Sequence, residues 1–265
     1  MINLETMVSY EGNGLSLRNN ILTIHQTLND YIKIDKSLSI ILEEGVQAFI
    51  CDVSTGQQIH IEIQKGAILN YQILDSKNTY RSIHCQGEVH ITEICLEENQ
   101  ETLQIHLLEP AASATVEALV LASQFQQVFK QEILHQQKET FSNISNFGVA
   151  IHGGEILFDT TGKIEKGMAK SKCVQLSKGI VMDDTSSVTS KPILLIDEYD
   201  VVANHGASIG KMSDESLFYL MSRGLTKQEA FLLILEGIVH PFIEKIADPI
   251  DKEKINNHIE QLIKR

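Results

Sequence analysis

The sequence predicts a mainly β protein that ends in an α-helical segment. Between about residues 15 and 205, short runs of alternating apolar and polar residues are broken about every 8 to 12 residues by Gly, Asn, Asp or Ser. Helix signals are sparse in that stretch and become frequent only after His205. Without helices between the strands, βαβ units do not fit, which leaves a sandwich, a barrel or a β-helix.

The strand predictions rest on runs in which isoleucine supplies much of the inward face. The best examples are residues 21–25, 59–63, 89–94, 103–107 and 179–182. The histidines in several of these runs stand beside Thr, Gln and Glu, and we interpret them as solvent-facing strand residues: His25, His60, His90 and His106. Residues 150–155, with a His-Gly-Gly block, predict a turn between two strands.

Two helix boundaries follow from capping patterns after the β region. Ser213 is a plausible N-cap with acidic residues in the next turn, and Arg223-Gly224 is a C-terminal stop. Thr226 and Glu229 form a capping box for a second, largely apolar helix. Pro241 is expected to end or kink that helix, and a last helix is expected from about Pro249.

Composition narrows the class of protein. The 265 residues are 43% hydrophobic and 22% charged, which is typical of a globular chain. Asp and Glu total 35 against 22 Lys and Arg, for a net charge of −13, so nucleic acid is an unfavourable partner. The N-terminus does not resemble a signal peptide, and the longest apolar runs, such as 231–235, fall far short of the roughly 18 residues of a membrane span. We expect a cytoplasmic protein without a membrane partner.

Local catalytic and metal-binding motifs give little support for an enzyme. The four cysteines, at positions 51, 85, 95 and 173, form no C-x-x-C pair, and we expect reduced thiols. The sequence contains no P-loop. Adjacent acidic pairs, such as Asp183-Asp184, are interpreted as solvated charge in turns.

Residues 197–230 carry the most distinctive pattern. His205-Gly-Ala-Ser208 is followed by Leu217-Phe-Tyr-Leu-Met-Ser-Arg-Gly224 and then by Glu229-Ala230. In this order the three blocks resemble the C-terminal signature of the SufB/SufD family, the scaffold proteins of the SUF iron–sulfur cluster assembly system. In that family a His-Gly-Ala-Thr or His-Glu-Ala-Thr block ends the last β-helix strand, and a Leu-Phe-Tyr-Leu-x-Ser-Arg-Gly helix follows.

The resemblance implies a right-handed parallel β-helix with a C-terminal α-helical module. We therefore expect a β-helix core over residues 1–210, with a short N-terminal lead-in, and a helical module over residues 211–265. The resemblance also implies that the helical module docks on a SufC-type ABC ATPase. The β-helix would pair with a SufB-like subunit or with a second copy of this chain, which looks like a compact form of the family.

The resemblance marks His205 as a candidate metal ligand where scaffold subunits meet, since neutral imidazole is a competent ligand for iron. Gly206 follows it, as in SufD-type chains, whereas SufB-type chains have glutamate there. The nearest counterpart of the cluster-linked SufB cysteine is Ser177, and Cys173 lies four residues earlier. Either the thiolate is missing, as in SufD, or an indel brings Cys173 to the site. The implied cofactor is an iron–sulfur cluster, held transiently and shared with a partner.

Phe218, Tyr219 and Arg223 lie in the helix that matches the family signature and are the candidate ATPase-binding residues. A structural alternative packs Phe218 into the β body and makes Arg223 a helix cap. The expected function is a non-catalytic, SufD-like scaffold whose partner hydrolyses ATP. Two alternatives stay open here: a SufB-like cluster holder that uses Cys173 and His205, and a β-helical carbohydrate-active enzyme.

Overall fold

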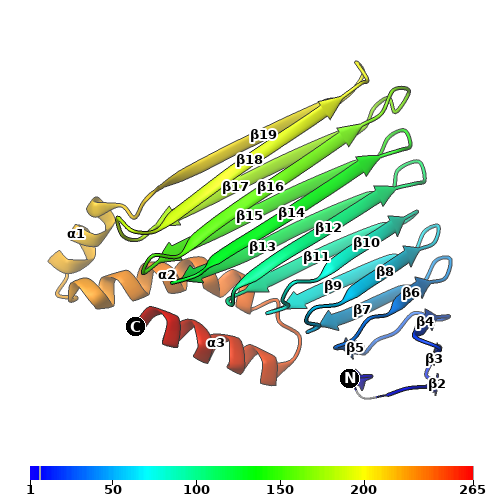
Figure 1. The fold of residues 1–265 in the computed structure, drawn as a ribbon, viewed down its shortest axis with the longest axis horizontal. Coiled ribbons are helices and arrows are strands. Elements are labelled where there is room, and N and C mark those ends of the chain that lie inside the picture. Colours follow the sequence, from blue (N-terminus) through cyan, green and yellow to red (C-terminus); the bar gives the residue numbers. More distant parts are fainter. Residues whose placement is uncertain (6, 265) are drawn as a thin grey trace.

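A computed structural model describes residues 1–5 and 7–264 and confirms a parallel β-helix followed by three helices (Figure 1). From residue 21 onward, successive strands alternate between two sheets, so that each coil adds one strand to each sheet. Sheet A contains, in spatial order, β1 (Ile2–Asn3), β5 (Tyr31–Ile34), β7 (Gln47–Asp52), β9 (Ile68–Leu74), β11 (Glu88–Cys95), β13 (Ser113–Ser123), β15 (Phe141–Ile151), β17 (Lys172–Val181) and β19 (Val202–Lys211). Sheet B contains β18 (Ser187–Ile196), β16 (Glu155–Ile164), β14 (Gln126–His135), β12 (Asn99–Leu107), β10 (Tyr80–Cys85), β8 (Gln58–Ile63), β6 (Ser39–Leu42), β4 (Ile21–Ile24), β3 (Leu15–Arg18) and β2 (Tyr10–Gly12).

The two ends of the β-helix differ. Near the N-terminus, β2, β3 and β4 pair in an antiparallel manner, whereas the later pairs are parallel. The strands lengthen along the chain, from 4 residues in β6 to 10 residues in β18 and β19. Among the described residues, no strand lies beyond β18 in sheet B or beyond β19 in sheet A, so both edges of the last coil are open.

Alternation along each strand fills the space between the sheets, here called the lumen. Ile61, Ile83 and Ile105 occupy matching positions in β8, β10 and β12 and are fully buried. Such in-register ladders place the same face of every coil toward the lumen, because successive side chains of a strand point to opposite faces. The predicted period of two is therefore the feature that builds the core.

The predicted caps define the helices α1 (Asp214–Ser222), α2 (Lys227–Ile243) and α3 (Pro249–Lys264). The Ser213 side chain accepts a hydrogen bond from the backbone of Ser216, and Thr226 and Glu229 form the capping box. Pro241 does not end α2, which continues two residues further. A proline near the end of a helix removes only one of the last backbone hydrogen bonds, which limits its effect there.

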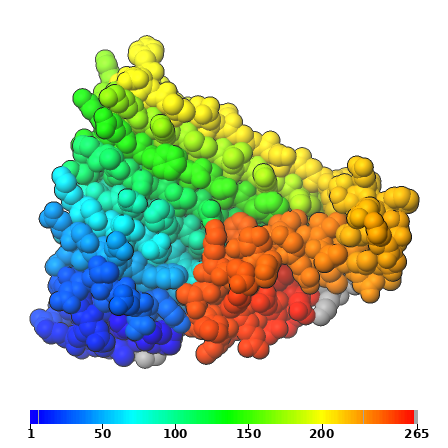
Figure 2. All heavy atoms as spheres, turned by 180° about the vertical axis from the view of Figure 1, so that it is seen from behind, coloured from blue at the N-terminus to red at the C-terminus, as the bar shows by residue number. Residues whose placement is uncertain are grey.

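Helices α2 and α3 pack on the outer face of sheet A. Leu235 and Val239 of α2 and Ile255 and Ile259 of α3 share one buried cluster with apolar residues of β7 to β15, among them Leu119. Figure 2 shows these helices, in orange and red, against the cyan and green coils, while the yellow last coil runs along the edge. None of the helices in the described part of the chain has the length and hydrophobicity to span a bilayer. The domain division at residue 210 stays a prediction, although the strands end at Lys211.

Candidate functional site at the open end of the β-helix

His205 lies in the middle of β19, the edge strand of sheet A, and its side chain is exposed. Its register partner in β17 is Gln175, a buried residue whose side chain points into the lumen. Because register partners in a parallel sheet share a face, His205 points to the lumen side of the last coil. No further coil covers that side among the described residues, so the imidazole lies at the open mouth of the β-helix.

Cys173 is not brought together with His205. It lies in β17, in register with Ala203 of β19, so the two Cα atoms are one strand and two residues apart, a separation of about 8 Å. The thiol is buried, and its sulfur fills the space beside Gly162, where an added Cβ would come within 2.3 Å of it. Burial raises the pKa of Cys173, against a smaller opposite effect of a hydrogen bond with Ser142.

The other three cysteines are also free and buried. Burial raises the pKa of Cys51 and of Cys85 to about 12, and it raises the pKa of Cys95 well above its usual range. Iron binds the thiolate and not the thiol, so ligation by any of these groups requires a proton to be lost. In this conformation His205 is the accessible ligand of the predicted pair, and Cys173 is a protonated lumen residue.

Polar side chains line the lumen below the mouth, a feature that the sequence analysis missed. Gln175 donates from Nε2 to the carbonyl of Ile193 at 3.3 Å, and Asn146 donates from Nδ2 to Oε1 of Gln131 at 2.7 Å. Ser177, the predicted counterpart of the SufB cysteine, is buried in the same row as Asn146. In the sequence, this polar lining is visible as polar residues at inward-facing strand positions. Such residues can be recognised only once the inward face of each strand is known.

Apolar side chains are also exposed around the last coil. Leu176 of β17, Ile193 and Leu195 of β18, and Ile209 of β19 are each 40% or more exposed. These residues lie beside the unpaired edges of β18 and β19, whose backbone N–H and C=O groups have no strand partner on one side within the described residues. Long, exposed edges of this kind are templates for pairing with another chain.

Helix α1 follows β19 directly and presents the predicted docking residues. Phe218 is 74% exposed and Tyr219 is 56% exposed, and α1 buries none of its described side chains. The structural alternative in which Phe218 packs into the β body is therefore wrong, although Arg223 is the C-cap residue of α1. Arg223 also lies over the Tyr219 ring, 5.3 Å from its centroid, and donates to the Tyr219 hydroxyl at 3.2 Å. Exposed aromatic residues beside an arginine are typical of protein-binding surfaces.

Comparison with known proteins agrees with the geometry. The family model described as SUF system FeS cluster assembly, SufBD core domain, matches residues 24–238. The chain is 35% identical over 136 residues to the iron-sulfur cluster assembly protein SufD of Bacillus subtilis, which covers 51% of this chain and 31% of that protein. It is 27% identical over 210 residues to SufD of Plasmodium falciparum, covering 77% and 13% of the two chains.

A plant relative covers more of the sequence. Protein ABCI7, chloroplastic, of Arabidopsis thaliana is 20% identical over 246 residues, which is 84% of this chain and 52% of that protein. The chain therefore spans about half the length, or less, of the curated relatives that it matches.

Proposed function

Because this chain belongs to the SufBD family of the SUF iron–sulfur cluster assembly system, we propose that it acts as a SufD-like scaffold subunit. In this proposal the chain is non-catalytic, pairs with a SufB-like subunit and binds a SufC-type ABC ATPase that supplies the energy. A cytoplasmic location stays a prediction of the sequence.

The open last coil is the observation that carries this proposal. Two ten-residue edge strands, β18 and β19, end the β-helix without a covering strand among the described residues, and apolar side chains surround them. Pairing of these edges with a second β-helix would satisfy their backbone groups and cover that apolar surface. A partner that binds there would also enclose His205.

The cluster would be held at this joint, with His205 as one ligand or as a positioning contact. Since Gly206 has no side chain and Cys173 is buried and protonated, this chain offers little else there, and the partner would supply most of the thiolates. Because the partner would supply most of the thiolate ligands, the SufD-like role is favoured over a SufB-like cluster holder that uses Cys173. A pair of identical copies would lack those thiolates, which makes a SufB-like partner the better match.

Helix α1 supports the ATPase contact. It offers Phe218, Tyr219 and Arg223 to solvent, while α2 and α3 hold the helical segment on sheet A. The match to the SufBD family also favours the scaffold role over the alternative of a carbohydrate-active enzyme.

An anaerobic co-purification tests the proposal. The tagged chain is expressed with the SufC-type ATPase and the SufB-like protein of the same cell, and the mass of the purified complex is determined. A defined complex that contains all three proteins is expected. If the tagged chain co-purifies with neither partner, the scaffold assignment is overturned.

Variants of the same complex separate the two family roles. His205→Ala should reduce cluster assembly without unfolding the chain, and Cys173→Ser should leave bound iron unchanged. His90→Ala, an exposed histidine on β11, is the matched control. Loss of iron in Cys173→Ser would instead assign the SufB-like role, and unchanged assembly in His205→Ala would remove the ligand assignment.

A further inference from the structure

Two groups of histidine and carboxylate side chains converge in the described part of the chain away from the open end. In one group, His258 of α3 lies 3.7 Å from Oδ2 of Asp75 and 3.3 Å from Oε1 of Glu97. Those contacts join α3 to the corners of the β-helix, so helix docking accounts for that group. The other group consists of His60, Glu62 and His84. It does not connect a helix to the β-helix, and it does not cover the hydrophobic core.

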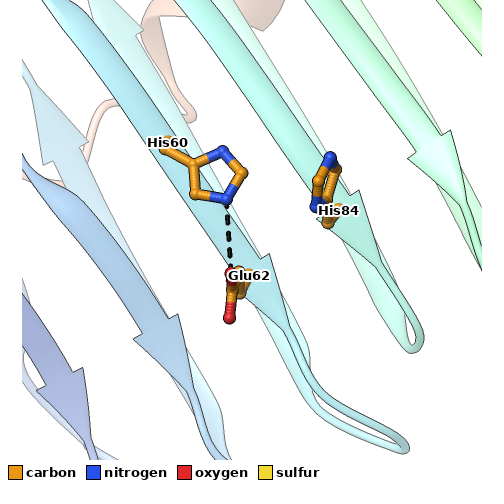
Figure 3. Close-up of side chains that lie close together, drawn as sticks. All are labelled: His60, Glu62 and His84. Carbon is orange, nitrogen blue, oxygen red and sulfur yellow. Dashed lines mark hydrogen bonds and ion pairs between the residues drawn. The ribbon is translucent and has the colours of Figure 1, made fainter.

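His60, Glu62 and His84 lie on the outer face of sheet B. His60 and Glu62 are two residues apart on β8 and so share a face, and His84 is the direct register partner of Glu62 on β10. Figure 3 shows the His60 ring above Glu62 on one strand and the His84 ring beside them on the next. His60 Nε2 lies 3.4 Å from Glu62 Oε1, and the two imidazole centroids are 4.8 Å apart.

We propose that His60, Glu62 and His84 form a binding site for a divalent first-row transition-metal ion of the Fe²⁺ or Zn²⁺ type. Two imidazoles and one carboxylate are the ligand set of the His₂Glu zinc sites and of the facial triad of non-haem iron sites. This site is distinct from the open mouth at His205, because β8 and β10 lie in the middle of sheet B, with β12, β14 and β16 between them and β18.

The distances fit such an ion after small rotations of the side chains. One ligand atom of each residue lies within 4.8 Å of the other two. Metal–ligand bonds of about 2.0 to 2.2 Å bring neighbouring ligand atoms to about 3 to 3.6 Å from each other. The backbone need not move, because the parallel ladders between β8 and its neighbours β6 and β10 fix the three Cα positions.

The surroundings leave part of the coordination sphere open. A hollow of about 370 Å³ beside the group is lined by Glu62 and His84, but not by His60, together with Glu44, Lys65 and Gln86. Three protein ligands on an exposed sheet face leave room for water at the other positions of the ion. The site therefore suits an ion that exchanges with solvent, and not a permanently enclosed structural ion.

Metal titration of the full chain tests the site. The chain is prepared without a polyhistidine tag and titrated anaerobically with Fe²⁺ and, separately, with Zn²⁺ in a calorimeter. His60→Ala, His84→Ala and Glu62→Gln should each weaken binding of the ion by at least about tenfold. The matched control is His90→Ala, because His90 and Glu88 form the same two-residue pair on β11, with Nε2 and Oε2 3.6 Å apart, and lie outside both groups of three.

The expected result is saturable binding that is at least about tenfold weaker in both histidine variants and stays within twofold of the wild type in His90→Ala. Circular dichroism should show unchanged secondary structure in all variants, since the replaced side chains lie on the outer face of the sheet. Absence of saturable binding by either ion would overturn the site. Wild-type affinity in His60→Ala or in His84→Ala would overturn it as well.

Discussion

Arg81 and Asp52 form a buried ion pair inside the lumen, with Nη2 of Arg81 2.6 Å from Oδ2 of Asp52 and both side chains 0% exposed. Nε of Arg81 also donates to Asp52 at 2.9 Å, and Nη1 lies 3.0 Å from a carboxylate oxygen of Glu101. Burial and the charge of Glu101 raise the pKa of nearby Glu93 well above its usual range. One guanidinium therefore contacts the carboxylates of both Asp52 and Glu101 inside the lumen.

Replacing Arg81 should be strongly destabilising. Arg81→Met leaves the carboxylates of Asp52 and Glu101 buried without a cation, and the free energy of unfolding should fall by about 3 to 5 kcal/mol. Urea denaturation followed by circular dichroism measures the change. Arg18→Met, which removes an exposed arginine on β3, should change the free energy by less than about 0.5 kcal/mol. Equal effects of the two substitutions would contradict the structural role of the buried pair.

The lumen histidine should make stability depend on pH. Burial lowers the pKa of His135 to about 4, and its ring nitrogens bond to the hydroxyls of Thr140 and Ser142 at 2.8 Å. An unfolded histidine titrates near about 6.5. Between these two values the unfolded chain binds a proton that the folded chain does not, so stability falls as the pH is lowered from about 6.5 to 4. The total contribution of this group is up to about 3 kcal/mol, and it is fully present above pH 6.5.

His135→Gln should therefore flatten the decrease in stability between pH 6.5 and 4. The measurement is the free energy of unfolding at several pH values for the wild type and the variant, with His90→Gln as the control. A decrease of the same steepness in wild type and His135→Gln would show that the lumen accepts the charged imidazole.

An ion pair between the β-helix and α3 should hold that helix in place. Nζ of Lys33 on β5 donates to Oδ2 of Asp251 at 2.6 Å, and both side chains are less than 10% exposed. Although burial opposes it, the hydrogen bond and charge of Asp251 raise the pKa of Lys33. Lys33→Met should cost about 2 to 4 kcal/mol and increase amide hydrogen exchange in α3. Lys254→Met removes an exposed lysine 3.6 Å from the same carboxylate and should have little effect on either quantity.

The exposed face of α1 should matter for binding but not for folding. Phe218→Ala should weaken binding of the SufC-type ATPase by at least about tenfold, because a central aromatic anchor contributes much of a binding energy. The melting temperature should change little, since Phe218 is mostly exposed. Surface plasmon resonance compares this variant with Ile250→Ala, which removes an exposed apolar residue of α3 and leaves α1 unchanged. Unchanged affinity in Phe218→Ala would place the ATPase contact elsewhere.

Local patterns in the sequence predicted the parts of the fold that depend on near neighbours. Alternating runs predicted strands such as β8 and β11, and capping residues such as Ser213 and Thr226 predicted the starts of α1 and α2. The choice of a β-helix over a sandwich or barrel came from the resemblance of the C-terminal blocks, because the period of two is common to all three architectures.

Contacts between coils could not be predicted in the same way. Glu62 and His84 meet because of the register between β8 and β10, and Cys173 is displaced from His205 because of the register between β17 and β19. A single sequence does not reveal register, since it depends on the length of every turn. Arg81 shows a further difficulty, because a charged residue in a strand is normally interpreted as solvent-facing and not as the centre of a buried cluster.

The short connection between β19 and α1 has a mechanical consequence. Only Met212 and Ser213 separate the strand that carries His205 from the helix that carries Phe218, and at its other end α1 is joined through a short turn to α2, which is fixed on sheet A. The connection is therefore too short to absorb a movement of α1 relative to β19. In the proposed complex with a SufC-type ATPase, a displacement of α1 would therefore pull on the edge strand and strain the mouth of the lumen over a path of a few residues.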